Sequence, residues 1–252
     1  MCHLLSLRET AKDARYDHPF YGCSVTWSMA ERNGIDMGLF KTILDLLFPP
    51  KCVFCSKLLG KTDEGWCDKC TESLPYADNY GRQNGDVFDF CISPLYYTDV
   101  VRHSILRYKF NGMSQYSDIY GKILAECILE NPDINYDIIS WVPLSSKRER
   151  TRGYDQAKLL ALAAASELDE VALETLKKHR NVQAQSELGD KEQRSTNISG
   201  AYEALNPEFI AGKRILLIDD VVTTCSTLEE CARVLLAAGA AGVVCATLAR
   251  GE

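Results

Sequence analysis

Alternating strands and helices in the C-terminal two thirds of the chain constrain the fold most. From about residue 88 onward, short apolar stretches take turns with amphipathic stretches of helical spacing. Strands that alternate with helices pair in parallel and carry helices on both faces. The sequence therefore predicts an α/β fold with a doubly wound, mostly parallel sheet over residues 86–252. The expected strands are residues 91–98, 136–144, 213–220 and 241–249, and the expected helices are residues 99–110, 117–130, 154–168 and 226–239.

The bulk composition is that of an ordinary globular protein, with 252 residues, 46% hydrophobic and 25% charged. The net charge of −7 argues against a protein that coats nucleic acid without sequence preference, although it is compatible with a local basic groove. The longest uncharged run, residues 234–249, is broken by Gly239 and Gly242 and predicts no membrane helix. The N-terminus lacks the basic and apolar pattern of a secretory signal. We therefore expect a cytoplasmic protein without membrane insertion.

The N-terminal part divides into three stretches. Residues 1–36 show no sustained apolar period, so we expect a disordered extension, and Met37 is an alternative translation start. Residues 37–80 combine an amphipathic helix, stopped by Pro49 and Pro50, with a cysteine-dense module. The following polar residues, 79–85, are interpreted as a linker.

Four of the eleven cysteines form two Cys-x-x-Cys pairs: Cys52 with Cys55, and Cys67 with Cys70. Two such pairs close a tetrahedral thiolate shell around Zn²⁺, and a closed shell stabilises a fold without catalysing a reaction. A redox pair is the alternative, because the sequence Trp66-Cys67-Asp-Lys-Cys70 is superficially similar to a thioredoxin motif. The remaining cysteines are scattered, and most of them are interpreted as small core residues.

An apolar strand that ends in two carboxylates is the main candidate ligand site. Residues 215–218 are apolar and run directly into Asp219 and Asp220. Adjacent carboxylates need hydroxyl groups or cations as partners, and ribose hydroxyls would serve. The next residues, 223–227, offer N–H groups and hydroxyls just before a helix, an arrangement that binds phosphate. Because open α/β sheets bind ligands at the carboxyl ends of strands, the segment predicts a sugar-phosphate site.

A simple helix cap is the alternative for part of this segment. Ser226 and Glu229 have the spacing of a capping box, which any helix can carry, but such a box does not explain the two aspartates. The chain has neither a Walker-type phosphate loop nor the Gly-x-Gly-x-x-Gly pattern. Nucleoside triphosphate and dinucleotide sites therefore lose support.

The sequence ILLIDDVVTTCST (residues 215–227) resembles the phosphoribosyl-pyrophosphate signature of type I phosphoribosyltransferases, which has glycine where this chain has Cys225. The opening ILDLLFPPKCVFC, the paired Cys-x-x-Cys, VPLSSKRERTRGYDQA and the Asp-Asp-Thr-Thr loop, in this order, resemble the ComF family from about Met37 to the C-terminus. This resemblance implies a phosphoribosyltransferase-type fold with a structural zinc module. Some members of the family are implicated in handling single-stranded DNA during natural competence.

The resemblance also implies roles for individual residues. Asp219 and Asp220 would be the catalytic pair, and the residues that bind substrate would be Val221, Thr223, Thr224, Cys225, Ser226 and Thr227. The basic segment after the expected strand 136–144 would bind pyrophosphate through Lys147, Arg148, Arg150 and Arg152, where the alternative is a solvated surface. Residues 177–197 would form a closing loop with Arg180, Gln185, Lys191 and Arg194, where the alternative is an ordinary surface hairpin.

Three functions follow as hypotheses. The first is Mg²⁺-dependent binding of phosphoribosyl pyrophosphate or a related sugar phosphate, with transfer of the phosphoribosyl group to an acceptor that the sequence does not identify. The second is a non-catalytic protein that binds single-stranded DNA during DNA uptake, together with helicase-type competence proteins. The third, a thiol or redox protein, requires metal-free cysteine pairs. The sequence does not determine an oligomeric state.

Overall fold

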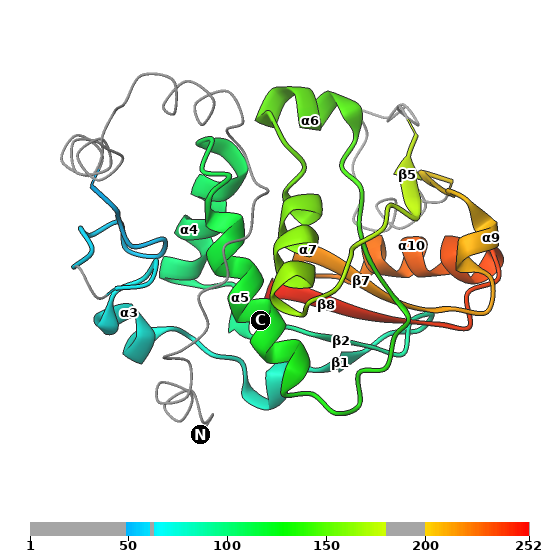
Figure 1. The fold of residues 1–252 in the computed structure, drawn as a ribbon, viewed down its shortest axis with the longest axis horizontal. Helices are drawn as coiled ribbons and strands as arrows, with labels where there is room; N and C mark the ends of the chain where they lie inside the picture. The colour runs from blue at the N-terminus through cyan, green and yellow to red at the C-terminus, as the bar shows by residue number, and fades with distance from the viewer. Residues whose placement is uncertain (1–48, 61–62, 180–199, 252) are drawn as a thin grey trace, which may run out of the picture. The chain divides into compact units, whose positions relative to one another are not determined.

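The computed structural model describes residues 49–60, 63–179 and 200–251. Its centre is a sheet in the order β1 (Gln83–Asn84), β2 (Phe90–Ile92), β8 (Gly242–Arg250), β7 (Arg214–Val222), β4 (Ile138–Trp141), with β3 (Leu95–Tyr96) also paired to β8 (Figure 1). The strands β2, β3 and β7 pair in parallel with β8, and β4 pairs in parallel with β7, whereas the edge strand β1 is antiparallel to β2. The prediction of a mostly parallel sheet is therefore confirmed.

The central strand β7 is apolar because both of its sides are covered. Ile138 of β4 lies opposite Ile215, and Leu217 lies opposite Cys245 of β8. Residues 215–218 are fully buried. A strand inside a parallel sheet is packed on both faces, so its sequence is a continuous apolar run.

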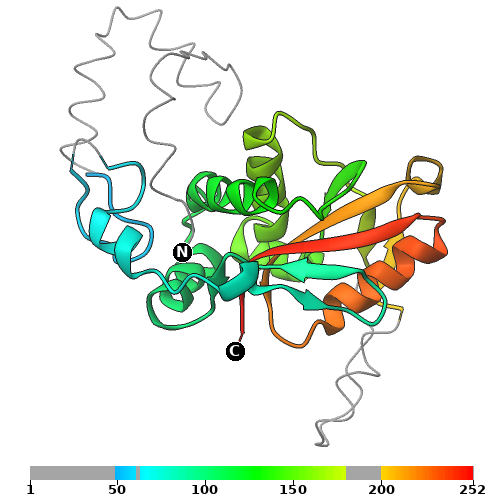
Figure 2. The same cartoon turned by 90° about the horizontal axis from the view of Figure 1, so that it is seen from below.

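Helices cover both faces of the sheet. One face packs against α4 (Asp99–Phe110), α5 (Tyr116–Leu129) and α7 (Gln156–Glu167). The other packs against α10 (Ser226–Ala237), α9 (Pro207–Ile210) and the antiparallel hairpin of β5 (Leu176–Lys178) and β6 (Tyr202–Ala204). Figure 2 shows α10 and α7 on opposite sides of the strands. The doubly wound arrangement is confirmed.

Helices α5 and α7 approach each other closely at Gly121. A Cβ atom at this position would lie 2.5 Å from the Cβ of Ala163, which is closer than two carbon atoms can pack. The small residues of α7, among them Ala161, Ala164 and Ala165, complete this buried contact. The close packing fixes α7, whose first turn lies beside the candidate site.

Three segments differ from their predicted structure. The expected strand 91–98 is interrupted at Pro94, which has no N–H group to donate to a neighbouring strand. The predicted linker 79–85 contributes the short helix η2 (Asp78–Gly81) and the edge strand β1. The basic segment, expected as a loop, forms α6 (Ser146–Arg152). A further helix, α3 (Asp68–Ser73), begins directly after Cys67 and contains Cys70.

Some predictions concern residues outside the described part of the chain. These are the extension 1–36, the helix that begins at Met37, and the loop residues Arg180, Gln185, Lys191 and Arg194. The residues 50–252 form one compact unit. Within the described residues, no helix has the length and apolar character that crossing a membrane requires.

Candidate ligand site and zinc site

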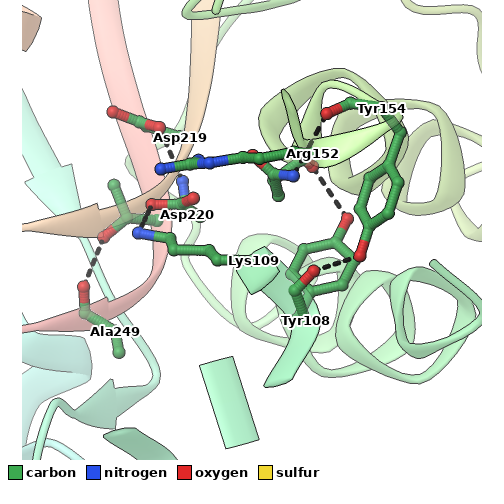
Figure 3. Close-up of polar contacts among 9 residues, drawn as sticks. Tyr108, Lys109, Arg152, Tyr154, Asp219, Asp220 and Ala249 are labelled. Atoms are coloured by element: carbon green, nitrogen blue, oxygen red, sulfur yellow. Dashed lines mark hydrogen bonds and ion pairs between the residues drawn. The ribbon is translucent and has the colours of Figure 1, made fainter. Parts of the chain in front are cut away.

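Asp219 and Asp220 lie near the carboxyl end of β7, as predicted. The strand continues to Val222, so both aspartates lie within it. Because successive side chains of a strand point to opposite faces, Asp219 and Asp220 point to opposite faces of the sheet. Asp220 forms an ion pair with Lys109 of α4, with 2.7 Å between Oδ1 and Nζ (Figure 3). Asp219 Oδ1 accepts a hydrogen bond from the backbone N–H of Asp220 at 2.8 Å. One aspartate therefore has a cation as its partner, whereas the other is held by the backbone.

The two carboxyl groups have different electrostatic surroundings. Burial, together with the negative charge of Asp220, raises the pKa of Asp219 to about 8, although Lys109 acts in the opposite direction. A carboxyl group with this pKa exchanges its proton near neutral pH. Its charged form is stabilised by any ligand that brings hydroxyl donors or a cation. The pair is thus suited to a polyhydroxylated ligand or to a hard metal ion.

The loop after β7 has a residue in the left-handed region directly before a helix. Thr223 and Thr224 are exposed, and Cys225 has φ +57° and ψ −10°, in the left-handed region that favours glycine. Helix α10 begins at the next residue, Ser226, and no side chain caps its N-terminus. Ser226 Oγ lies 3.1 Å from Thr224 Oγ1.

The capping box considered above is not formed. Glu229 does not reach back to the helix start, because its Oε1 accepts the backbone N–H of Asp86 at 2.7 Å. Cys225 Sγ instead accepts a hydrogen bond from Gln83 Nε2 at 3.0 Å. These contacts join Cys225 to Gln83 of the edge strand β1 and the first turn of α10 to Asp86 just after it, and they leave the start of α10 uncapped.

The basic segment becomes a short helix at the same edge of the sheet. Lys147, Arg148 and Arg150 are exposed, and Arg152 is half-buried. Arg148 and Arg152 are four residues apart and so share one face of α6. Arg152 Nη1 donates to Gln156 Oε1 at 2.7 Å, and its guanidinium lies 4.8 Å from the centre of the Phe110 ring. In Figure 3 the Arg152 side chain extends in the direction of Asp219 and Asp220.

Asp155 and two tyrosines hold α6 and α7 in position. The Asp155 carboxylate accepts the N–H of Leu144 at 2.7 Å and that of Lys158 at 3.1 Å, so it joins the segment before α6 to the first turn of α7. Burial raises the pKa of this carboxyl group. Tyr108 donates to the Gln156 carbonyl at 2.8 Å, and Tyr154 donates to the Tyr108 carbonyl (Figure 3). Helix α4 is thereby tied to the basic segment.

The sequence did not single out Lys109 or Asp155, whose side chains make contacts at this edge of the sheet. Asp155 is the N-cap of α7, and its side chain accepts a hydrogen bond from the N–H of Lys158. Lys109 follows the buried Tyr108 in the amphipathic helix α4, and this position alone does not indicate a role for it. The partnership of Lys109 with Asp220 depends on the packing of α4 against the sheet, which no local pattern encodes.

The four predicted cysteines come together as one cluster. The Sγ atoms of Cys52, Cys55, Cys67 and Cys70 all lie within 4.8 Å of one another. Cys55 Sγ and Cys67 Sγ are 3.7 Å apart. A tetrahedral site with Zn–S bonds of about 2.3 Å requires sulfur atoms about 3.8 Å apart. The cysteines therefore fit structural zinc, and among the described residues they form the one candidate metal-binding group of this kind.

The thiols of this cluster are not equivalent. Burial acts to raise the pKa of Cys52, but hydrogen bonds from the backbone of Cys55, Cys67 and Phe54 outweigh it and lower the pKa to about 7. Burial raises the pKa of Cys70, as do its hydrogen bonds to neighbouring thiols. N–H groups directed at sulfur stabilise a thiolate, which is the form that binds metal.

Two family models match the chain in the regions just described. A double zinc ribbon domain matches residues 43–90, and a phosphoribosyl transferase domain matches residues 156–252. With the doubly wound sheet and the cysteine cluster, these matches define a phosphoribosyltransferase-type protein with an N-terminal zinc module.

Two curated relatives narrow this class. Competence protein ComFC of Bacillus subtilis is 29% identical over 173 residues, which cover 65% of this chain and 62% of the relative. DNA utilization protein YhgH of Salmonella typhimurium is 31% identical over 233 residues, which cover 81% of this chain and 100% of the relative. The chain belongs to the ComF family, which includes these competence and DNA utilization proteins. It spans less than two thirds of the length of the Bacillus relative.

One match among solved structures is a glutamine phosphoribosylpyrophosphate amidotransferase from B. subtilis, complexed with ADP and GMP. The match has a TM-score of 0.38 and 20% sequence identity, and it covers 53% of this chain and 26% of that chain.

Proposed function

We propose that this protein binds phosphoribosyl pyrophosphate, or a closely related sugar phosphate, at the carboxyl edge of the sheet. The observation that carries the proposal is the loop between β7 and α10. It combines two acidic side chains, a left-handed residue at position 225 and an uncapped helix start within a few residues. Hydroxyl groups of a ribose suit the carboxylates, and a 5-phosphate suits the N–H groups at the start of α10.

The basic helix α6 supports a ligand with a second anionic group. Arg148 and Arg152 share one face of this helix, and α6 follows β4, the strand that neighbours β7. Guanidinium groups bind phosphate oxygens through paired hydrogen bonds. A sugar that carries phosphate at one end and pyrophosphate at the other would use both the α10 loop and α6.

Transfer of the phosphoribosyl group would follow from this arrangement. The bond between C1 and the pyrophosphate oxygen breaks, its electron pair leaves with pyrophosphate, and an acceptor atom forms the new bond to C1. Asp219 and Asp220 would hold the ribose while positive charge develops on it, and Arg148 and Arg152 would stabilise the leaving group. The carboxylate oxygens of Asp219 and the oxygens of pyrophosphate are ligands of the kind that Mg²⁺ prefers. When bound, this ion would supply further positive charge to stabilise the leaving group.

Binding of single-stranded DNA is the second candidate. It is favoured by the three exposed cations of α6, Lys147, Arg148 and Arg150, and by the names of the relatives, which refer to competence and DNA utilization. In this function, α6 would contact the phosphate backbone of the strand. The partners would then be other proteins of DNA uptake, including helicase-type proteins. A cytoplasmic location agrees with either function.

Calorimetric titration separates the two candidates. We expect the protein to bind phosphoribosyl pyrophosphate in the presence of Mg²⁺, and Asp220→Asn to weaken this binding by about 1.5–3 kcal/mol while the fold is retained. Asp118→Asn, at an exposed aspartate of α5, is the matched control and should bind like the unmodified protein.

The same titration with a short single-stranded oligonucleotide tests the second candidate. If phosphoribosyl pyrophosphate and ribose 5-phosphate both fail to bind with Mg²⁺ present, while the oligonucleotide binds equally to the unmodified protein and to Asp220→Asn, the sugar-phosphate function is wrong. The DNA-binding function would then replace it.

A further inference from the structure

Phe110 is an aromatic side chain that is exposed beside the candidate ligand site. It is the last residue of α4 and is 62% exposed. The only other exposed phenylalanine, tyrosine or tryptophan among the described residues is Phe209, on α9. The turn after Phe110 is open as well, because Asn111 and Gly112 are exposed and a Cβ atom added to Gly112 would have no neighbour within 4 Å. Much of the ring is therefore accessible to a ligand.

A contact with Arg152 distinguishes Phe110 from an ordinary exposed side chain. Single apolar residues are common on protein surfaces and by themselves indicate nothing. Here the Arg152 guanidinium lies over the ring, 4.8 Å from its centre, and its Nη1 donates to Gln156 Oε1 at 2.7 Å. The arginine is thus fixed by the first turn of α7, and it holds the phenyl ring in place. A ring that is already held loses little conformational entropy when a planar ligand stacks on it.

Two contacts place the ring beside the end of β7. Lys109 directly precedes Phe110 on α4, and its Nζ lies 2.7 Å from Asp220 Oδ1. Arg152, which contacts the ring, extends its side chain in the direction of Asp219 and Asp220 (Figure 3). A ribose bound by these two aspartates would therefore have the exposed ring near it.

Arg152 can contact the ring and an anionic ligand at the same time. A guanidinium group is planar, so it stacks on an aromatic ring through its face and donates hydrogen bonds from its edges. One of these N–H groups binds Gln156, and others are left for phosphate oxygens. The aromatic ring and the proposed phosphate-binding helix α6 therefore share one residue and can serve one ligand.

We propose that Phe110 stacks on a nucleobase that the ligand carries next to its sugar. This inference rests on the proposed sugar-phosphate function and names the class of group that lies beside the sugar. Every nucleobase has an aromatic face, so stacking on an exposed ring tolerates any of the bases. The base belongs either to a mononucleotide or to a single strand. The chemistry at the ring is the same in both cases, and the experiment separates the two sources.

Phe209 provides a matched control. It is also 62% exposed, but α9 precedes the amino end of β7, whereas the aspartates lie near the carboxyl end. Phe110→Ala and Phe209→Ala remove the same ring from the two positions. Phe110→Leu keeps an apolar side chain without an aromatic face, and Phe110→Trp enlarges that face. Because both positions are exposed, we expect all of these variants to keep the native fold, which circular dichroism checks.

Calorimetric titration with Mg²⁺ compares ligands that differ only by the base. Each of the four ribonucleoside 5′-monophosphates is paired with ribose 5-phosphate, and a short single-stranded oligonucleotide is paired with an abasic strand of the same length. Phe110→Ala and Phe110→Leu should lose about tenfold in affinity for the base-bearing member of a pair and keep the affinity for the base-free member and for phosphoribosyl pyrophosphate. Phe110→Trp and Phe209→Ala should bind at least as tightly as the unmodified protein. A loss with the mononucleotides assigns a small ligand as the source of the base, and a loss with the oligonucleotide alone assigns a strand.

Fluorescence gives a second readout, which a merely structural role of Phe110 would not produce. In Phe110→Trp a stacked base should quench the emission of the new indole, whereas the base-free ligands should not. The unmodified protein, with its three tryptophans, gives the baseline, and Phe209→Trp is the control.

Three results would contradict the inference. Equal affinities of Phe110→Ala and Phe209→Ala for every base-bearing ligand would overturn it alone, provided that phosphoribosyl pyrophosphate still binds. An equal loss for the base-bearing and base-free members of a pair would show that Phe110 acts only through Arg152, and would also overturn it alone. Failure of the unmodified protein to bind both phosphoribosyl pyrophosphate and ribose 5-phosphate would overturn the proposed function, and this inference with it.

Discussion

Cys225 carries a side chain where the backbone of the candidate phosphate loop favours glycine. Its φ of +57° costs an L-residue about 1–2 kcal/mol. Cys225→Gly removes this cost, while the added freedom of glycine in the unfolded chain offsets about 0.5–1 kcal/mol of the gain. We expect stability to the denaturant urea to change by less than about 1 kcal/mol. Phosphoribosyl pyrophosphate should bind at least as tightly, because no Cβ atom would crowd the phosphate.

Cys225→Val is the matched opposite change. A β-branched residue in the left-handed region is strained by about 1–3 kcal/mol, so this variant should be clearly less stable than the unmodified protein. Equal urea midpoints for the glycine, cysteine and valine forms would contradict the backbone conformation described here.

Asp219 should make the stability of the ligand-free protein depend on pH. Its pKa in the folded protein is raised to about 8 by burial and by Asp220, whereas an unperturbed aspartate has a value of 3.8. The folded state therefore keeps a proton that the unfolded chain has lost, and this contribution to stability decreases as pH rises through that window. Asp219→Asn, which cannot ionise, should be more stable than the unmodified protein at pH 8 by about 1 kcal/mol or more.

Denaturation in urea at a series of pH values measures this effect. The advantage of Asp219→Asn should shrink as the pH approaches 4, where the unfolded aspartate is also protonated. Asp118→Asn changes an exposed carboxylate and should show no such trend. An advantage of Asp219→Asn that is constant over the whole range would mean that titration is not its cause.

At the residue scale, candidate site residues on one contiguous segment could be predicted from the sequence. Contacts between residues of different elements could not. Asp219, Asp220 and the loop to Thr227 are contiguous, so their roles could be inferred from the order of residues alone. Lys109 reaches the same edge from α4, which is far from β7 in sequence. Its approach depends on which face of the sheet α4 covers, and that is a property of packing.

At the scale of elements, α4 joins the zinc module to the candidate ligand site. Arg107 donates to the carbonyls of Val53 and Phe54 at 2.8 and 2.7 Å, within the first cysteine pair. Ser104 donates to the Val53 carbonyl as well. Two residues after Arg107 on the same helix, Lys109 holds Asp220. The zinc module thus packs on a helix that also contributes to the ligand site.

Removal of zinc should therefore destabilise more than the cysteine module. We expect one zinc ion per chain, and a melting temperature that falls by roughly 5 °C or more after chelation, because the loop between Cys52 and Cys55 would no longer present its carbonyls to α4. Elemental analysis and thermal denaturation measure the two effects. Cys52→Ser should melt like the chelated protein and should not respond to the chelator.

A zinc content below half an equivalent, together with two disulfides in freshly purified protein, would contradict the assignment of structural zinc. It would favour the redox alternative for the two cysteine pairs.

The predicted elements agree best with the structure where periodicity is strong. Helices 99–110 and 226–239 and strand 213–220 were recognised from long, regular apolar patterns, and their observed bounds differ by a few residues at most. The basic segment gave no apolar period, so it was expected as a loop. It forms α6 because its ends are held by Asp155 and by Gly153, which has φ +86° and ends the helix. Tertiary contacts of this kind leave no pattern in the local sequence from which the helix could be predicted.

At the scale of the whole molecule, residues 50–252 form one compact unit that contains both sites. Residues 1–36 lack a periodic apolar pattern and have little apolar surface to offset their ordering entropy. We expect a chain that begins at Met37 to melt at the same temperature as the full chain. Thermal denaturation of the two forms, side by side, tests this, and a clear loss of stability in the shorter chain would assign a structural role to the extension.

The distribution of charge over the molecule predicts a different salt dependence for the binding of each of the two candidate ligands. The net charge is −7, yet α6 presents Lys147, Arg148 and Arg150 to solvent. A single-stranded oligonucleotide bound through these cations should lose affinity steeply with salt, with a logarithmic slope of about −0.7 for each phosphate contact. Phosphoribosyl pyrophosphate, held by the α10 loop and Mg²⁺, should respond chiefly to removal of Mg²⁺.

Lys147→Gln and Arg150→Gln sharpen the comparison, because each removes a cation from α6 but lies off the face shared by Arg148 and Arg152. Each change should reduce the salt slope of oligonucleotide binding by about 0.7 and leave the affinity for phosphoribosyl pyrophosphate unchanged. Titrations at several salt concentrations measure both quantities. If instead both changes weaken the sugar phosphate and leave the salt slope of the oligonucleotide intact, the whole of α6 serves the small ligand, and any DNA must bind to another surface of the protein.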